Sequence, residues 1–170
     1  MDKDQLINLV LEVYKAKKEA KDYLDFFENP NIDKRMEKAR ADIQKAIIRV
    51  KRGLLKPRML AVKDAIKSIS SLSPGEEYIA DIMVYAFNEF CIGAMFGRMK
   101  DATLRSVVKL MNDTIVFADK NGLSASVLPR MQATIQSLKT DYIYRREFKR
   151  IIEDSFAVAI ENCGRQIYLS

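Results

Sequence analysis

The sequence predicts an all-α protein, a single-domain helical bundle of about seven helices over residues 1–170. Apolar residues recur at intervals of three and four along nearly the whole chain. The four prolines and six glycines fall almost entirely between such segments, and alternating β-branched runs joined by hairpin turns are absent. With 48% hydrophobic and 31% charged residues, the chain can bury a core without disulfides or metals.

The first helix is expected over about residues 2–28, and it is a candidate for a semi-independent N-terminal element. It ends at the Asn-Pro-Asn sequence of residues 29–31, because a proline disfavours helical geometry in the residue before it. A second helix is expected from about residue 33 to residue 52. It ends at Gly53, a residue suited to a left-handed helix cap.

A third helix is expected over about residues 57–72, because its proline suits a first helical turn. The fourth helix has the clearest start in the chain. Ser73 is predicted as its N-cap, Pro74 as its first residue and Glu76 as the partner in a capping box. This helix is expected to reach about Phe96.

Three further helices are expected over about residues 101–120, 125–138 and 141–162. The first of them ends at the Asn-Gly sequence of residues 121–122 and the last at the Asn-Cys-Gly sequence of residues 162–164. Helix pairs would then begin near residues 33, 74 and 124, at spacings of about 41 and 50 residues. HEAT repeats have periods of about 40–47 residues. A short stack of HEAT-like helical pairs is therefore an alternative to a compact bundle.

The longest apolar segment, residues 78–97, contains Asp81, Asn88 and Glu89. A membrane helix would bury a central aspartate at a cost of roughly 2.5–3.5 kcal/mol. The segment is better explained as the central helix of a soluble bundle. The first residues are acidic, unlike those of a signal peptide. We therefore expect a cytoplasmic protein without membrane insertion.

Positive charge is concentrated in one fifth of the chain. Residues 34–67 hold twelve basic and three acidic residues, whereas the rest holds seventeen basic and twenty acidic residues. On a helical wheel at about 100° per residue, the second helix separates an apolar face from a basic one. The basic face carries Lys34, Lys38, Lys45, Arg49 and Arg52.

The leading hypothesis is a non-enzymatic binding or adaptor module that presents this basic face to an anionic partner, either a nucleic acid backbone or an acidic protein. The segment contains no aromatic residue, which argues against stacking on single strands. The alternative is that the basic face is merely solvated. The protein would then act through helix-mediated protein contacts or as a homodimer.

The fourth helix carries a polar stripe on an otherwise apolar circumference. The stripe consists of Asp81, Tyr85, Asn88 and Glu89. Buried carboxylates need partners, and the basic segment offers Arg58, Lys63 or Lys67. A carboxylate pair in apolar surroundings can also carry out acid–base chemistry. An enzyme that uses Asp81 and Glu89 is the third hypothesis.

No catalytic residue, cofactor or metal site is assigned from the sequence. The chain has no histidine, which excludes an imidazole base, a histidine-containing triad and a histidine-ligated metal. Cys91 and Cys163 lack metal-ligand spacing and are expected to be reduced thiols. No glycine-rich phosphate loop is present, because "GAMFGR" lacks the lysine and strand context of a P-loop.

Three stretches, "FFENP", "KRMEKA" and "YIADIMVY", together resemble a family of small all-helical bacterial proteins that is classified as a domain of unknown function. The resemblance covers about residues 5–122. It is carried by Phe26, Phe27, Asn29, Pro30, Lys34, Lys38, Ala80, Asp81 and Tyr85. It implies a helical fold, and because no activity is attached to the family, it assigns no catalytic residue.

Overall fold

The computed structural model describes residues 1–167, and it confirms the all-α fold: 79% of the described residues are helical. Eight helices and one short antiparallel hairpin make up the described part. Their bounds are α1 (Lys3–Ala16), α2 (Lys18–Glu28), α3 (Ile32–Ile47), β1 (Val50–Lys51), β2 (Leu54–Leu55), α4 (Met59–Ser70), α5 (Glu76–Phe96), α6 (Asp101–Lys120), α7 (Ser124–Gln136) and α8 (Ile143–Ile167).

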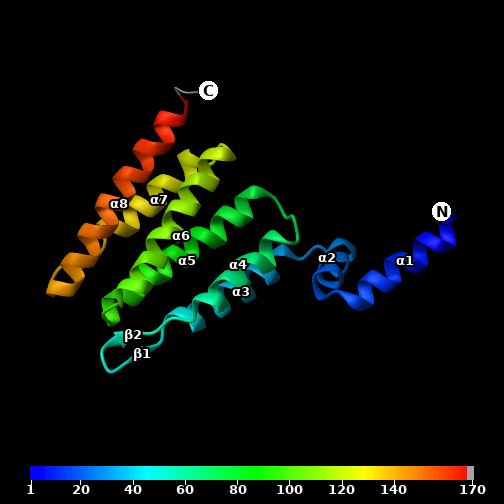
Figure 1. Ribbon diagram of the computed structural model, residues 1–170, viewed down its shortest axis with the longest axis horizontal. Coiled ribbons are helices and arrows are strands. Elements are labelled where there is room, and N and C mark those ends of the chain that lie inside the picture. The colour runs from blue at the N-terminus through cyan, green and yellow to red at the C-terminus, as the bar shows by residue number, and fades with distance from the viewer. Residues whose placement is uncertain (168–170) are drawn as a thin grey trace.

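Helices α3 to α8 form the body of the molecule, with α5 at its centre (Figure 1). The helix α5 packs against α3 and α4 on one side and against α6, α7 and α8 on the other. The pairs α3/α4, α5/α6 and α7/α8 follow one another through the bundle, so that the first and third pairs are joined mainly through the second. The bundle thus has the layer order of stacked helical pairs.

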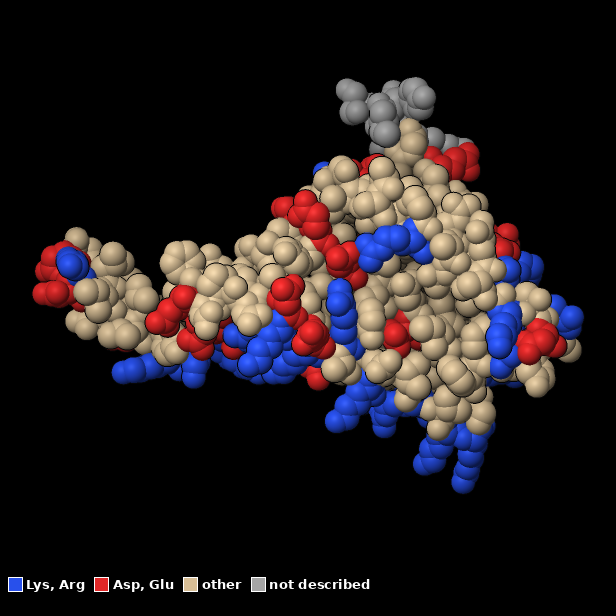
Figure 2. Space-filling model, turned by 180° about the vertical axis from the view of Figure 1, so that it is seen from behind, with Lys and Arg blue, Asp and Glu red and all other residues tan. Residues whose placement is uncertain are grey.

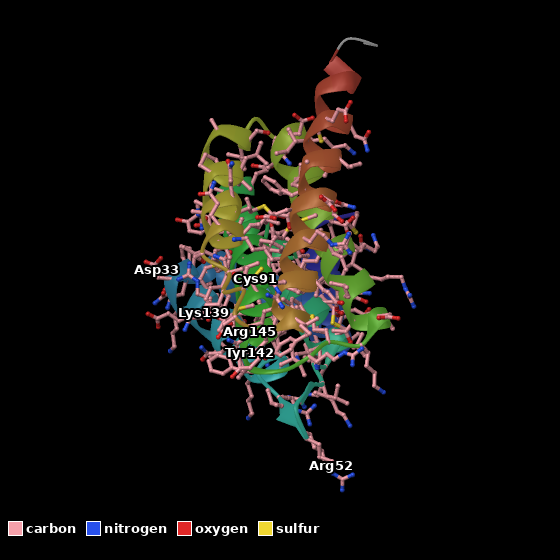
Figure 3. All side chains as sticks on the ribbon, turned by 90° about the vertical axis from the view of Figure 1, so that its left-hand side faces the viewer. Asp33, Arg52, Cys91, Lys139, Tyr142 and Arg145 are labelled. Atoms are coloured by element: carbon pink, nitrogen blue, oxygen red, sulfur yellow. The ribbon has the colours of Figure 1, made fainter. Side chains whose placement is uncertain are left out.

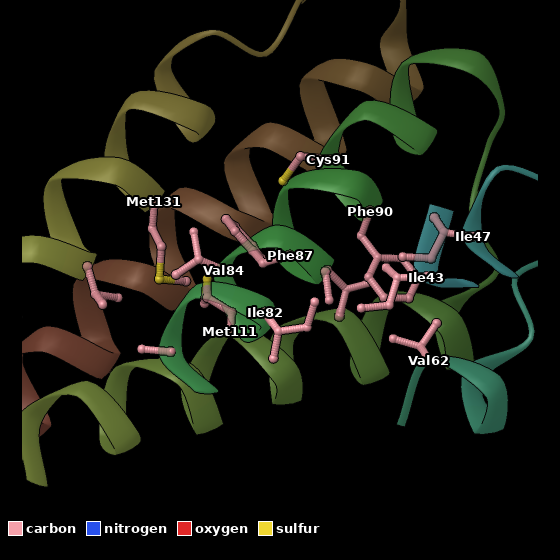
Figure 4. Close-up of a cluster of buried hydrophobic side chains, with 14 of the residues drawn as sticks. Ile43, Ile47, Val62, Ile82, Val84, Phe87, Phe90, Cys91, Met111 and Met131 are labelled. Atoms are coloured by element: carbon pink, nitrogen blue, oxygen red, sulfur yellow. The ribbon is translucent and has the colours of Figure 1, made fainter. Parts of the chain in front are cut away.

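The hydrophobic core follows α5 along its length. Phe87 and Phe90 of α5 are fully buried, and Figure 4 shows them between Ile43 and Ile47 of α3 and Met131 of α7. By length and composition α5 could cross a membrane. Its apolar character is accounted for by these neighbours, because a helix that is apolar on most sides must be covered on most sides.

The predicted N-terminal helix of residues 2–28 is divided in two. Lys17 is extended, with φ −127° and ψ 117°, and it separates α1 from α2. The helix α1 begins with a capping box formed by Asp2 and Gln5. Neither helix has a buried residue, and together they form an arm that projects from the body (Figure 1).

The second helix also ends earlier than expected, at Ile47, and a hairpin follows it. Arg52 and Gly53 have φ angles of 53° and 72°. Positive φ at both central residues is the requirement of a two-residue type I′ hairpin turn. Gly53 is therefore a turn residue and not a helix cap. The hairpin is anchored by Leu55, which is 1% exposed.

Other helix limits also differ from the prediction. The helix α4 begins at Met59 with Arg58 as its N-cap, so Pro57 lies before the helix and not in its first turn. Ser73 is not the N-cap of α5, because the chain passes through positive φ at Ser73 and Gly75, and Gly75 is the N-cap. The helix α8 continues past the expected stop near residue 162 to Ile167. The helix α6 has the predicted limits, residues 101–120.

Close backbone contact fixes the hairpin against the end of α5. The backbone N–H of Leu55 donates to the carbonyl of Arg98, and the N–H of Arg98 donates to the carbonyl of Gly53, both at 2.9 Å. A Cβ at Gly97 would lie 3.0 Å from the backbone nitrogen of Leu55. Gly97 has an extended φ of −161°, which any residue adopts, so the restriction at this position is purely steric.

We expect Gly97→Ala to lower the free energy of unfolding by about 1–3 kcal/mol, as overpacking does elsewhere. Backbone cannot move aside as a side-chain tip can, so the hairpin must shift. Urea denaturation measures the change. Gly164→Ala is the matched control, since nothing lies within 4 Å of a Cβ added at that position. This substitution should be neutral or stabilising by up to about 1 kcal/mol. Equal stability of the Gly97 variant and the wild type would contradict the contact.

Candidate functional site

The predicted basic residues lie on two elements instead of one helical face. Lys34, Lys38 and Lys45 are exposed along α3. Arg49 follows the end of α3, and Arg52 lies at the hairpin turn, where Figure 3 shows it at the tip of the molecule. The helical-wheel placement of the two arginines was wrong because the helix ends at Ile47. We call these five residues the basic edge.

The basic edge is exposed to solvent and forms no ion pairs in the part of the chain whose side chains the structure describes. All five side chains are exposed, and within residues 1–164 none of them has a carboxylate within 4.0 Å. Figure 2 shows Lys and Arg gathered along one edge of the molecule, from beneath the arm to the hairpin end. Lysine and arginine side chains that are not paired with acids leave a positive potential at the surface.

A groove of about 420 Å³ runs between α3 and α4 beside the basic edge. Its charged lining residues are Lys18, Asp22, Arg35, Lys38, Asp42, Lys45, Arg58 and Asp64. Five of these are basic and three are acidic. Arg58, which the sequence suggested as a partner for Asp81, lies here instead, and its backbone N–H donates to the carbonyl of Ala46 at 2.9 Å. The groove extends the positive surface from α3 towards α4.

The ion pair of Asp81 differs from the expectation. Arg130 of α7 donates to Asp81 at 2.5 Å, and the two side chains are 47% and 38% exposed. The expected partners Lys63 and Lys67 line a different groove, to which α5 contributes Met83. Two residues turn a helix by about 200°, so these lysines face the side of α5 away from Asp81.

The other members of the stripe bind α5 to helices on either side. On the α7 side, Thr134 donates from its hydroxyl to Asn88 Oδ1 at 2.8 Å. On the α3 side, Tyr85 lies below the Arg40 guanidinium, whose central carbon is 5.8 Å from the ring centroid. The stripe therefore fastens α3 and α7 to the central helix.

Glu89 is the buried carboxyl of the stripe, at 6% exposure. Burial raises its pKa, and hydrogen bonds from Tyr85 and Gln44 oppose that rise. One of its oxygens, Oε2, has no hydrogen-bond partner. The pKa of Tyr85 is also raised, first by burial and then by the neighbouring Glu89. The site is a desolvated structural contact between α5 and α3.

The two carboxylates of the enzyme hypothesis do not form a pair. Asp81 turns to α7 and Glu89 to α3, and eight residues separate them by about 12 Å along the helix axis. The geometry does not favour two carboxylates acting on one substrate. Among the described residues, no group of three or more Cys, Asp or Glu side chains could hold a metal ion.

Neither cysteine is placed for reactivity. Both are free within the described part of the chain. Cys91 is buried in the core (Figures 3 and 4), and burial raises the pKa of its thiol to about 12. A thiol with so high a pKa is not a nucleophile near neutral pH, because only the thiolate reacts. Cys163 is half-buried, and burial raises its pKa as well.

Comparison with known proteins identifies a family and adds no activity. The model of a family of unknown function, DUF6155, matches residues 1–156. The chain belongs to this family. No curated protein and no solved structure matches it. The expected resemblance to a family of unknown function is confirmed, and the match extends beyond residue 122, where the resemblance ended. Family membership transfers no site residue, so the geometry alone supports any assignment.

Sequence reasoning missed the residue that joins the end of α5 to the start of α8. The Arg145 guanidinium donates to both oxygens of Asp141, at 2.7 and 2.8 Å, and to the carbonyl of Met95. It also lies 4.7 Å from the ring centroid of Tyr142. An arginine near the last carbonyls of a helix is favourable. The available signal was only a cluster of arginines and tyrosines near residue 145.

The raised pKa of Glu89 predicts how stability depends on pH. A carboxyl with a higher pKa in the folded state favours folding when protonated, so stability falls as pH rises from its unfolded value of 4.5 through the folded pKa. We expect Glu89→Gln to remove this fall. Urea denaturation between pH 4 and pH 7 tests it, with Glu37→Gln as the control because Glu37 is an exposed acid of α3 that forms no ion pair within residues 1–164. A wild-type decrease that persists in the Glu89 variant would show that another group causes it.

Proposed function

We propose that this protein is a non-enzymatic binding module whose basic edge binds the phosphate backbone of a double-stranded nucleic acid. The observation that carries the proposal is the row of exposed lysines and arginines along α3 and the hairpin, which form no ion pairs with carboxylates within residues 1–164. Such groups attract phosphates without a pocket, and the interaction is independent of sequence.

The dimensions of the basic edge support a long polyanion over a small ligand. Lys34 and Lys45 are eleven residues apart on one helix, about 16 Å, and the turn at Arg52 extends the row further (Figure 3). Phosphates on one strand of a duplex recur about every 3.4 Å along the axis. A row of this length can therefore face several consecutive phosphates.

The residue types also favour contacts with the phosphate backbone of a nucleic acid over contacts with its bases. Three of the five side chains are lysines, which act as flexible point charges and do not require a fixed geometry. Residues 34–67 contain no aromatic side chain on which a base could stack. An acidic protein would meet the same cations, and it is the alternative outcome of the experiment below.

The test measures binding of a labelled DNA duplex by fluorescence anisotropy over a range of salt concentrations. Binding should weaken steeply with salt, by about 0.9 log units of affinity per log unit of salt for each phosphate contact. Combining Lys34→Glu, Lys38→Glu and Lys45→Glu should weaken binding by at least about tenfold. It should also reduce the salt slope by about 3, since three contacts are removed.

The matched control is Arg105→Glu, Lys120→Glu and Arg150→Glu, which changes the net charge equally at exposed positions off the basic edge. This protein should keep most of the wild-type affinity and slope. Equal losses of duplex affinity in both variants would show that binding depends on net charge alone, and they would contradict a defined binding surface. Failure of the wild type to bind the duplex, with salt-sensitive binding to polyglutamate, would favour an acidic protein partner.

A further inference from the structure

The helix α1 carries an apolar surface that nothing covers. Six of its apolar side chains are each between 42% and 48% exposed: Leu6, Ile7, Leu9, Val10, Leu11 and Val13. Its packing is confined almost entirely to α2, to which Tyr14 is joined by a hydrogen bond from its hydroxyl to Asp25 at 2.8 Å. A helix of 14 residues is marginal alone in water, and it gains stability by packing its apolar face.

The width of this face indicates the shape of its partner. At about 100° per residue, the six side chains cover an arc of roughly 200°. A two-helix coiled-coil seam covers a narrower stripe. An arc this wide is buried only when a helix lies in a groove and contacts walls on both sides. The matching site is thus a groove between two helices.

The body of the protein has such a groove between α4 and α6. Its volume is about 330 Å³, and its apolar lining comes from Met59, Val62, Ile66, Met83 and Leu110. The lining runs along α4 from Met59 to Ser70, a length of about 18 Å. The helix α1 is about 21 Å long by the same measure. Groove and helix therefore match in length and in polarity.

Their charges are opposite. The helix α1 with its N-cap, residues 2–16, contains three acids, Asp2, Asp4 and Glu12, and two lysines, Lys3 and Lys15, a net charge of −1. The groove is edged by Lys63, Lys67 and Lys109, with one acid, Asp113. Lys109 is already paired with Asp113 at 2.9 Å. Lys63 and Lys67 have no carboxylate within 4.0 Å in residues 1–164, and they are free to meet the acids of α1.

We propose that α1 docks in the α4–α6 groove of a second copy of this chain, and that reciprocal docking forms a twofold symmetric homodimer. In Figure 1, α1 projects away from the helices α4 and α6 of its own chain, which line the groove. Every copy supplies one arm and one groove, so two copies that exchange arms form a closed dimer in which both grooves are filled. An anionic membrane is disfavoured, because membrane-surface helices have polar faces rich in Lys and Arg, whereas the polar face of α1 has one lysine, Lys15, among Asp4, Gln5, Asn8 and Glu12.

The experiment is sedimentation velocity of the full chain over a wide range of protein concentration. The wild type should pass from monomer to dimer. Combining Leu9→Asp and Val10→Asp in the arm should weaken dimerisation by roughly 100-fold or more, as truncation of central interface residues does. Lys63→Glu with Lys67→Glu in the groove should weaken it measurably. No residue of α1 is buried, so circular dichroism melting should show an intact body in the arm variant.

Mixing the two defective variants tests exchange directly. The groove variant supplies an intact arm and the arm variant an intact groove, so the mixture should form a heterodimer with one contact of the two. Asn8→Asp, on the polar face of α1, is the control and should dimerise as the wild type does. A wild type that stays monomeric, or that binds anionic phospholipid vesicles through α1 in cosedimentation, would overturn the proposal. A groove variant that dimerises normally would instead indicate pairing between arms.

Discussion

The helix α5 carries apolar side chains around most of its circumference, so it is stable in water only with neighbours on several sides. Five helices supply them, and Phe87 and Phe90 are excluded from solvent as a result. This need for cover organises the body: the pair α3/α4 lies on one side of the α5/α6 pair, and α7/α8 lies on the other. The basic edge and the α4–α6 groove lie on the outer faces of this body.

The few polar and small residues of α5 determine which neighbour lies where. Asp81 and Asn88 bind α7, whereas Glu89 contacts Gln44 of α3. A Cβ at Gly93 would lie 2.9 Å from the Leu55 side chain, so the absence of one admits the hairpin. Apolar burial supplies the driving force, and these contacts supply specificity, since exchanging α3 and α7 would leave each polar group without its partner.

The sequence predicted what depends on local pattern. The limits of α6 and the central place of α5 follow from apolar periodicity and need no distant information. The predictions that were wrong concern residues that suit two competing local structures or residues whose partners lie far along the chain. Gly53 suits a helix cap and a hairpin turn equally well, and the choice moved Arg49 and Arg52 off the helix. Asp81 pairs with a residue 49 positions away, which no local pattern indicates. The exposed lysines of α3 were predictable, but the absence of ion pairs to them within residues 1–164 was not.

The basic edge and the α1 arm use different residues, yet dimerisation would couple them. A dimer carries two basic edges, and where both reach one polyanion, the second binds at a raised effective concentration. Linkage requires that a polyanion bound more tightly by the dimer also favours the dimer by the same factor. Loss of the arm would then weaken polyanion affinity without changing the contacts of a single edge, whereas loss of edge lysines would leave dimerisation without polyanion unchanged. These different effects distinguish an arm that acts by forming the dimer from an arm that contacts the polyanion itself.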